Sequence, residues 1–419
     1  MNRALTVWWD RAVAGTLQMN RHGEMRFTYA TGWLADASRP AISLSLPKQD
    51  RTFTQRQSRP FFAGLLPEAA QRDLIAGALG LSTGNEFGLL DALGGDVAGA
   101  LSLWPEGEVP PLPDSTATPQ PLNQDELLDL LETLPRRPLL AGREGLRLSL
   151  AGAQAKVPVV LADGQVALPA PGQPTTHILK PEIARFPHTT ENEALVMTLG
   201  AAVGLPVARV EVRAVKGLTY LLVARYDRAF DENGRVHRLH QEDFCQALGI
   251  PPERKYAADG GPTFKSGFDL IRQATARPAV AVLAFLDAAI FNLIVGNADG
   301  HGKNFSLLYA ADGVTLAPFY DLLSTVAYPD LSPKLAMKLA RQATLDEIRP
   351  ATWPAFADDI GVPAVFVRRR VRELSDAVSS QVLSLPDTAA LAELDRSELA
   401  RFAALIASRA GRLARTIPS

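Results

Sequence analysis

The sequence has little cysteine, no excess of charge of either sign and no unbroken apolar run long enough to cross a bilayer. The single cysteine, Cys245, excludes a disulfide framework and a cysteine metal cluster. We expect it to be a buried small apolar residue in a reducing, cytoplasmic protein. The 43 Lys and Arg residues nearly balance the 45 Asp and Glu residues, which excludes nucleic-acid binding through bulk positive charge.

The N-terminus carries no apolar run long enough for a signal peptide, so no export is expected. The most apolar stretch, residues 279–295, is interrupted by Asp287 and Asn292 and falls short of the roughly 20 residues that a membrane helix needs. We therefore predict a buried core helix there and no membrane contact.

The length of 419 residues predicts two or three domains. The first hundred residues open with period-two patterns that predict strands at 5–9, 13–19 and 42–46, and helical patterns near 67–79 and 86–93. We interpret residues 1–104 as a small β-rich domain. Six prolines crowd the next segment and predict a linker over residues 105–122.

A helix capped by Asn123 is expected to open the next domain, residues 123–226. Strand patterns follow, with one helix from Thr189 or Thr190 to about Val203. From residue 227 to 419 the pattern is helical. A small sheet domain and a larger all-helical one, with a cleft between them, are predicted.

The segment 297–305, Asn-Ala-Asp-Gly-His-Gly-Lys-Asn-Phe, is the sharpest chemical signal in the sequence. An aspartate, Asp299, with an asparagine five residues later, Asn304, is the spacing of a kinase catalytic loop. The aspartate would deprotonate an attacking hydroxyl, and the asparagine would bind Mg²⁺. The alternative is a polar turn at a helix end, because turns use the same residue types.

Three further signals stand in the chain order of a kinase. A small-residue loop at 149–156 would let the backbone approach phosphates. Lys180 ends an apolar strand, as an ATP-binding lysine would, and Glu191 or Glu193 on the next helix would be the glutamate that pairs with it. Asp321, set among apolar residues, would be a second Mg²⁺ ligand. The alternatives are a tight hairpin at 149–156, a solvent-facing side chain for Lys180 and a helix-capping role for Asp321.

Together these motifs resemble the HipA family of toxin kinases. The resemblance rests on Ser-Leu-Ala-Gly-Ala-Gln-Ala-Lys, His-Ile-Leu-Lys, Glu-Asn-Glu, Arg-Tyr-Asp-Arg and the long motifs at 239–249, 258–262, 297–306 and 320–324. The first hundred residues resemble the extra domain of that family, including residues 62–68.

The resemblance implies an α+β, protein-kinase-like fold of the lipid-kinase-related branch. The expected fold is bilobal, with an extra β-rich N-terminal subdomain and an all-helical C-terminal lobe. It implies a serine/threonine protein kinase that uses ATP and Mg²⁺, phosphorylates an aminoacyl-tRNA synthetase such as glutamyl-tRNA synthetase, and thereby inhibits translation and promotes dormancy. It also implies a HipB-type helix-turn-helix antitoxin as partner, and operator DNA bound through the pair, which represses its own operon.

Carried over to this sequence, the resemblance makes Asp299 the catalytic residue, Asn304 and Asp321 the Mg²⁺ ligands, and Ser149 the autophosphorylated serine. The residues implied to bind ATP are Ala151, Gly152, Ala153, Gln154, Lys180, Arg225, Tyr226, His301, Lys303, Asn304 and Asp321. Ala155 replaces an acidic residue usual in the family, and Ala224 replaces a hinge glutamate, so adenine contacts there would rest on backbone groups.

Two other readings of the whole chain remain open: a small-molecule or lipid kinase on the same fold, and a catalytically idle co-repressor, which the intact site residues disfavour. His240, Glu242 and Asp243 are interpreted as capping and packing residues rather than metal ligands. The arginines at 368, 369, 370 and 372 form either a solvated helix face or a DNA-binding patch.

Overall fold

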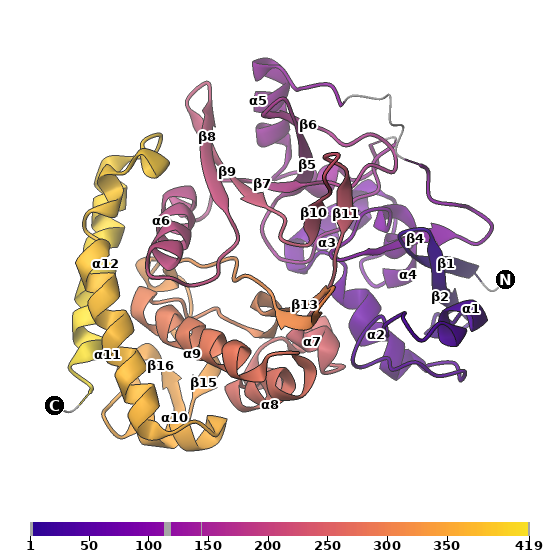
Figure 1. The fold of residues 1–419 in the computed structure, drawn as a ribbon. Helices are drawn as coiled ribbons and strands as arrows, with labels where there is room; N and C mark the ends of the chain where they lie inside the picture. The colour runs from indigo at the N-terminus through magenta and orange to yellow at the C-terminus, as the bar shows by residue number, and fades with distance from the viewer. Residues whose placement is uncertain (1–2, 113–118, 144, 418–419) are drawn as a thin grey trace. The chain divides into compact units, whose positions relative to one another are not determined.

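The computed structural model describes residues 3–112, 119–143 and 145–417. The chain forms two compact units (Figure 1). Unit 1 comprises residues 1–181 and 224–253, and unit 2 comprises residues 182–223 and 254–419. Unit 1 is therefore built from two separate stretches of sequence.

Unit 1 opens with a four-stranded antiparallel sheet in the order β3-β2-β1-β4. The strands are β1 (Arg3–Trp9), β2 (Ala12–Met19), β3 (Met25–Tyr29) and β4 (Leu101–Pro105). The alternation that predicted β1 places Leu5 and Val7 on the buried face, opposite Leu17 and Gly15 of β2. The two predicted strands at 5–9 and 13–19 are confirmed.

Four helices accompany this sheet: α1 (Thr31–Ala35), α2 (Gln55–Gly64), α3 (Ala69–Ala78) and α4 (Glu86–Leu93). They share an aromatic core with the sheet, including Phe27, Phe53, Phe61 and Phe62. The predicted strand at 42–46 is wrong, because this segment makes only a Ser43–Leu46 bridge around a turn. The Leu44 side chain stays partly exposed there, while Ile42 and Leu46 are buried.

The rest of unit 1 holds helix α5 (Gln124–Thr133) and the antiparallel strands β5 (Val157–Ala162), β6 (Gln165–Ala167) and β7 (His177–Pro181). The Asn123 side chain accepts from the backbone N–H groups of Asp125 and Glu126, which confirms the predicted cap. After residue 223 the chain adds β10 (Arg228–Phe230), β11 (Val236–Arg238), β12 (His240–Asp243) and α7 (Phe244–Ala247).

Unit 2 contains α6 (Thr189–Ala202), as the sequence predicted within a few residues, and the hairpin of β8 (Val210–Val215) and β9 (Leu218–Ala224). Its remaining helices are α8 (Phe264–Ala274), α9 (Pro278–Val295), α10 (Thr352–Ile360), α11 (Ala364–Gln381) and α12 (Arg396–Ala414). Helices α11 and α12 run side by side (Figure 1) and both pack on α9.

Helix α9 is long and apolar enough to cross a membrane by length and composition. Its C-terminal two-thirds are buried in unit 2, where Phe285 packs against Phe264, Phe268 and Phe305. This burial agrees with the predicted core helix.

The prediction of an all-helical segment after residue 227 is wrong. That segment also holds β10, β11, β12, and the two hairpins β13 (Ser306–Ala310) with β14 (Gly313–Leu316) and β15 (Lys334–Leu339) with β16 (Gln342–Thr344). These strands are three to six residues long, too short for period-two alternation to stand out beside long apolar helices.

Candidate functional site

The catalytic-loop candidate begins where α9 ends. Gly296 adopts a left-handed conformation with φ +77°, and a Cβ atom there would lie 2.4 Å from a Val326 side-chain carbon. Glycine is therefore required at this position. The chain leaves the helix directly into Asn297 and Ala298.

The loop is fixed to unit 2 by hydrogen bonds from buried groups. The Thr325 hydroxyl accepts from the Ala298 N–H at 2.8 Å and donates to the Gly296 carbonyl at 3.1 Å. The Ala298 carbonyl accepts from the Ala336 N–H at 2.8 Å. On the other side, the Asn297 side chain donates to Asn292 of α9 and accepts from the Asp299 N–H. The backbone on which Asp299 sits is thus held from several elements.

The structure brings Asn304 and Asp321 together, as the sequence predicted, with the Asn304 amide nitrogen 3.1 Å from an Asp321 carboxylate oxygen. The Asn304 amide oxygen accepts from the His301 N–H, which also lies 2.7 Å from the Asp299 carbonyl. Asp321 has a φ of +59°, a conformation uncommon for a non-glycine residue that recurs at functional sites. Asp321 offers a carboxylate and Asn304 an amide oxygen, which are hard-oxygen donors that Mg²⁺ prefers, so these residue types fit the expected cation once the amide oxygen is released from the His301 N–H.

His301 and Lys303 are both buried beside this pair. The His301 ring meets the Tyr256 ring edge-on, with centroids 5.4 Å apart. The Tyr320 hydroxyl donates to the Lys303 carbonyl at 2.7 Å and lies 2.8 Å from the Ser306 hydroxyl. Asp299 is exposed. The predicted residues 299–304 and 321 therefore form one cluster in unit 2.

The phosphate-loop candidate, residues 149–156, lies in unit 1 and is held by the N-terminal part of that unit. The Ser149 hydroxyl is fully buried and donates to the Leu65 carbonyl at 2.7 Å. The Gly152 carbonyl accepts from the Glu68 N–H at 3.1 Å, and Gly152 has a φ of +119°. The Lys156 ammonium donates to the Ala151 carbonyl.

Lys180 is buried on β7, and the Gln154 side chain donates to the neighbouring Pro181 carbonyl at 3.3 Å. The structure thus brings the phosphate-loop candidate next to the strand of the ATP-lysine candidate within unit 1. Glu191 and Glu193 are both buried on α6 of unit 2. Burial raises the pKa of Glu191, whose carboxylate lies 3.9 Å from the His188 ring nitrogen. Glu182, His188 and Glu191 place potential ligand atoms within 4.8 Å of one another, a grouping that the sequence did not suggest.

Arg225 and Tyr226, predicted to bind ATP, have side chains with other partners. The Arg225 guanidinium is buried against Asp96, Thr175 and Asp227, and the Arg225 backbone N–H donates to the Thr176 carbonyl. The Tyr226 hydroxyl donates to Gln241. A nucleotide contact by the Arg225 side chain does not fit these contacts, because its guanidinium is already enclosed by two carboxylates. Nothing local in the sequence indicates this cluster, since its members are up to 142 residues apart.

The residues that resembled metal ligands have the capping and packing roles that were expected. Asp243 caps α7 by accepting from the Gln246 N–H at 2.8 Å. Glu242 accepts from the Ser43 hydroxyl and the Leu44 N–H, and His240 is bonded to the Ile42 carbonyl. Cys245 is buried, as predicted.

The arginine cluster of α11 is partly neutralised, which favours the reading of a solvated helix face. Arg370 forms a bidentate pair with Asp287 at 2.9 Å, and both Arg369 and Arg370 approach Glu373.

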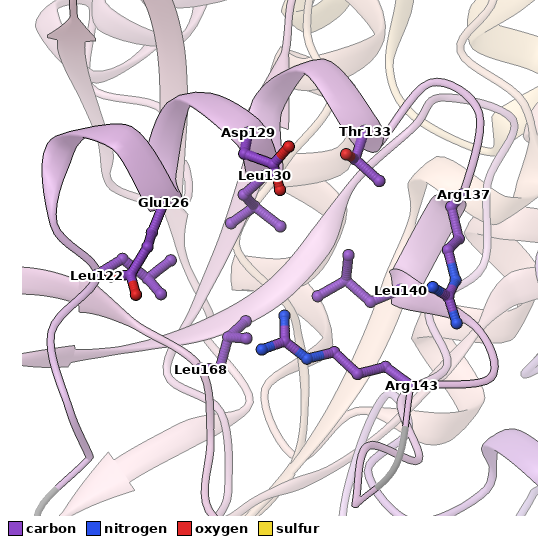
Figure 2. A pocket seen from close by; sticks show the side chains of 9 residues that line it. All are labelled: Leu122, Glu126, Asp129, Leu130, Thr133, Arg137, Leu140, Arg143 and Leu168. Carbon is purple, nitrogen blue, oxygen red and sulfur yellow. The ribbon is translucent and has the colours of Figure 1, made fainter.

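A pocket of about 450 Å³ lies under α5 in unit 1 (Figure 2). Leucines form much of its lining, with Glu126 and Asp129 projecting from α5 and the Arg143 side chain reaching toward Leu168 (Figure 2). Its lining includes none of the residues predicted to bind ATP.

Comparison with known proteins identifies the family of the chain. Residues 148–382 match the model of the HipA-like C-terminal domain, and residues 5–104 match that of the HipA N-terminal domain. The chain is 56% identical over 412 residues to the Sinorhizobium fredii protein Y4mE, covering 97% of this chain and 98% of that one. It is 31% identical to the serine/threonine-protein kinase toxin HipA of Shewanella oneidensis, covering 90% and 92%.

Among solved structures, the chain resembles one from the complex of Shewanella oneidensis HipA, HipB and operator DNA, with a TM-score of 0.82, 29% identity and 97% of each chain covered. This likeness supports an α+β, kinase-like fold. Since the C-terminal model spans more than half of the sequence and the relatives match along nearly the whole chain, the protein belongs to the HipA family.

Proposed function

We propose that this chain is an ATP-dependent serine/threonine protein kinase that acts as the toxin of a toxin–antitoxin pair. The observation that carries the proposal is the 3.1 Å pairing of Asn304 with Asp321, which joins the loop that bears Asp299 to a second carboxylate. The kinship with a named serine/threonine-protein kinase toxin supports the reaction class.

In the proposed reaction Asp299 orients the hydroxyl of the acceptor serine and takes its proton while the new O–P bond forms and ADP leaves. The exposure of Asp299 suits an acceptor as large as a protein. Asn304 and Asp321 would hold Mg²⁺, which offsets negative charge on the transferring phosphate. Lys180, His301, Lys303 and the backbone of 151–154 would contact ATP, and the backbone of 225–226 would face its base.

The proposed target is a serine of an aminoacyl-tRNA synthetase such as glutamyl-tRNA synthetase, so that the reaction inhibits translation in the cytoplasm and promotes dormancy. A HipB-type antitoxin would neutralise the kinase, and the pair would bind operator DNA and repress its own operon. The support for these partners is the complex in which the structural relative was solved.

Ser149 is the proposed site of autophosphorylation. Its hydroxyl is fully buried against the Leu65 carbonyl, a position with no room for a group of about −1.5 to −2 charge. Phosphorylation and the observed loop position would therefore exclude each other, which makes modification of Ser149 a self-limiting step.

Intact-mass spectrometry after incubation with Mg-ATP tests the kinase proposal, with Asp299→Asn as control. We expect one added phosphate on Ser149, and a rate about 10³-fold lower in the control, because a general base contributes roughly 10²–10⁴-fold. Protein shown beforehand to be unphosphorylated that gains no mass would contradict a self-phosphorylating kinase and favour a small-molecule kinase or an idle co-repressor.

A further inference from the structure

Asp96 of the N-terminal domain contacts the root of the phosphate-loop candidate through its backbone. Its N–H donates to the Arg147 carbonyl at 2.8 Å, and its carbonyl accepts from the Ser149 N–H at 3.0 Å. These two bonds form a short parallel bridge between Asp96 and Leu148. The backbone of Asp96 thus fixes the position of the backbone at the start of the phosphate-loop candidate.

The side chain of the same residue contacts the segment that follows β9. One Asp96 carboxylate oxygen accepts from Arg228 at 2.8 Å, and the other lies 3.3 Å from Arg225. The Thr175 hydroxyl donates to the second oxygen at 2.6 Å and also accepts from Arg225 at 2.8 Å. Asp96 therefore touches both segments that the family resemblance assigns to ATP, one to the phosphates and one to the base.

The cluster around Asp96 is fully buried and nearly balanced in charge. Asp96 and Asp227 face Arg225, Arg228 and, at the edge, Arg238, and the side chains of Arg225 and Arg228 are 1% exposed. Burial alone would raise the pKa of the Asp96 carboxyl, but the charges of Arg228, Arg225 and Arg238 outweigh it and lower that pKa. The carboxylate therefore stays ionised and keeps all its bonds at neutral pH.

We propose that Asp96 is a positioning residue for the nucleotide. Asp96 holds the phosphate loop and the segment 225–228 in a fixed position relative to each other. The proposal rests on the proposed function, since it concerns how the same ATP site is held. ATP must meet both segments at once, whereas adenosine needs only the base-binding one. Loosening the contacts of Asp96 with these two segments therefore lowers the affinity for ATP more than the affinity for adenosine. A general loss of stability would lower both affinities alike.

The test uses the full-length chain carrying Asp299→Asn, so that phosphorylation cannot alter the loop. Asp96→Asn removes the charge, and Thr175→Val removes one hydroxyl at nearly constant volume. Thr176→Val is the matched control, because the Thr176 hydroxyl contacts His177 instead. Binding of Mg-ATP and of adenosine is measured by titration calorimetry, and amide exchange is followed over residues 149–156 and 225–228.

For Asp96→Asn we expect the ratio of ATP affinity to adenosine affinity to fall about tenfold, and for Thr175→Val about threefold. Both factors lie within the free energy that the loss of one or two hydrogen bonds predicts. Exchange should quicken in both segments, and Thr176→Val should change neither quantity. If Asp96→Asn fails to fold, Thr175→Val decides the question.

An unchanged affinity ratio and unchanged exchange in either folded variant would overturn the positioning role. If the parent protein binds neither ATP nor adenosine, the proposed function itself fails. In that case amide exchange alone still decides whether Asp96 couples the two segments.

Discussion

The catalytic-loop candidate and the phosphate-loop candidate are held in different ways. Residues 297–304 are fixed by neighbours from the same unit, such as Thr325, which lies 27 positions from Ala298. Residues 149–156 are fixed by residues of the N-terminal domain, and the Leu65 carbonyl that accepts from Ser149 lies 84 positions upstream. The proposed chemistry thus depends on a short stretch of chain, whereas the proposed nucleotide loop depends on a second domain.

Among substitutions that should loosen one loop and not the other, we expect Thr325→Val to lower the free energy of unfolding most. Thr325→Val removes the hydroxyl that bonds both Ala298 and Gly296. The Gly296 carbonyl keeps the Val326 N–H as a partner, whereas the buried Ala298 N–H loses the hydroxyl. We expect a loss of about 2 kcal/mol in the free energy of unfolding, since one unsatisfied buried group costs roughly 1–3 kcal/mol. Urea denaturation measures the loss.

Amide exchange provides the control for Thr325→Val. Exchange should quicken at residues 297–304 and not at 149–156, because only the first loop is bonded to Thr325. Equal loosening of both loops would show that the two are not held independently.

A smaller effect is expected at Ser149. Ser149→Ala removes one hydrogen bond to the Leu65 carbonyl, so unfolding should become easier by about 1 kcal/mol. Exchange should now quicken at residues 149–156 and leave 297–304 unchanged. Ser38→Ala on the exposed surface provides a serine control with local contacts only; a Ser149→Ala protein as stable as this control would contradict a structural role for the buried hydroxyl.

The smallest effect concerns His240, which packs against Trp9 and Phe61 in unit 1. Burial lowers its pKa from 6.5 to about 4, so the unfolded chain binds a proton there before the folded protein does. Stability should therefore decrease as the pH falls from about 6.5 toward 4, with less than about 1 kcal/mol lost by pH 6.

His240→Gln isolates this contribution. Thermal melts between pH 7 and pH 6 should show a shallower decrease in the variant than in the parent protein. A parent protein with the same slope as the variant would place the acid sensitivity elsewhere.

The sequence predicted the elements whose signals are local. The apolar run of α9, the glycine that ends it and the Asp299–Asn304 spacing all lie within 30 residues, and the structure brings Asn304 and Asp321 into contact. The Asn123 cap and the alternation in β1 could be predicted equally well, because both signals are local.

The role of Asp96 could not be predicted, because its sequence context, Gly-Gly-Asp-Val, is that of an ordinary turn. Its partners become neighbours only after the fold forms. The arginines at 225 and 228 were visible in a family motif, but nothing near them in the sequence indicates two buried carboxylates. Likewise the strands after residue 227 were missed because short hairpins give weak periodic signals.

The discontinuity of unit 1 has a consequence for synthesis on the ribosome. Asp96 and Arg225 are 129 positions apart, so at roughly 5–20 residues per second the carboxylate waits on the order of 10 s before its first arginine partner is made. Until then the N-terminal domain can complete its sheet and aromatic core but cannot close the charged cluster. A chain that stops before residue 225 therefore leaves Asp96, at the start of the phosphate-loop candidate, without its arginine partners, and lacks the completed cluster that we propose to position the nucleotide.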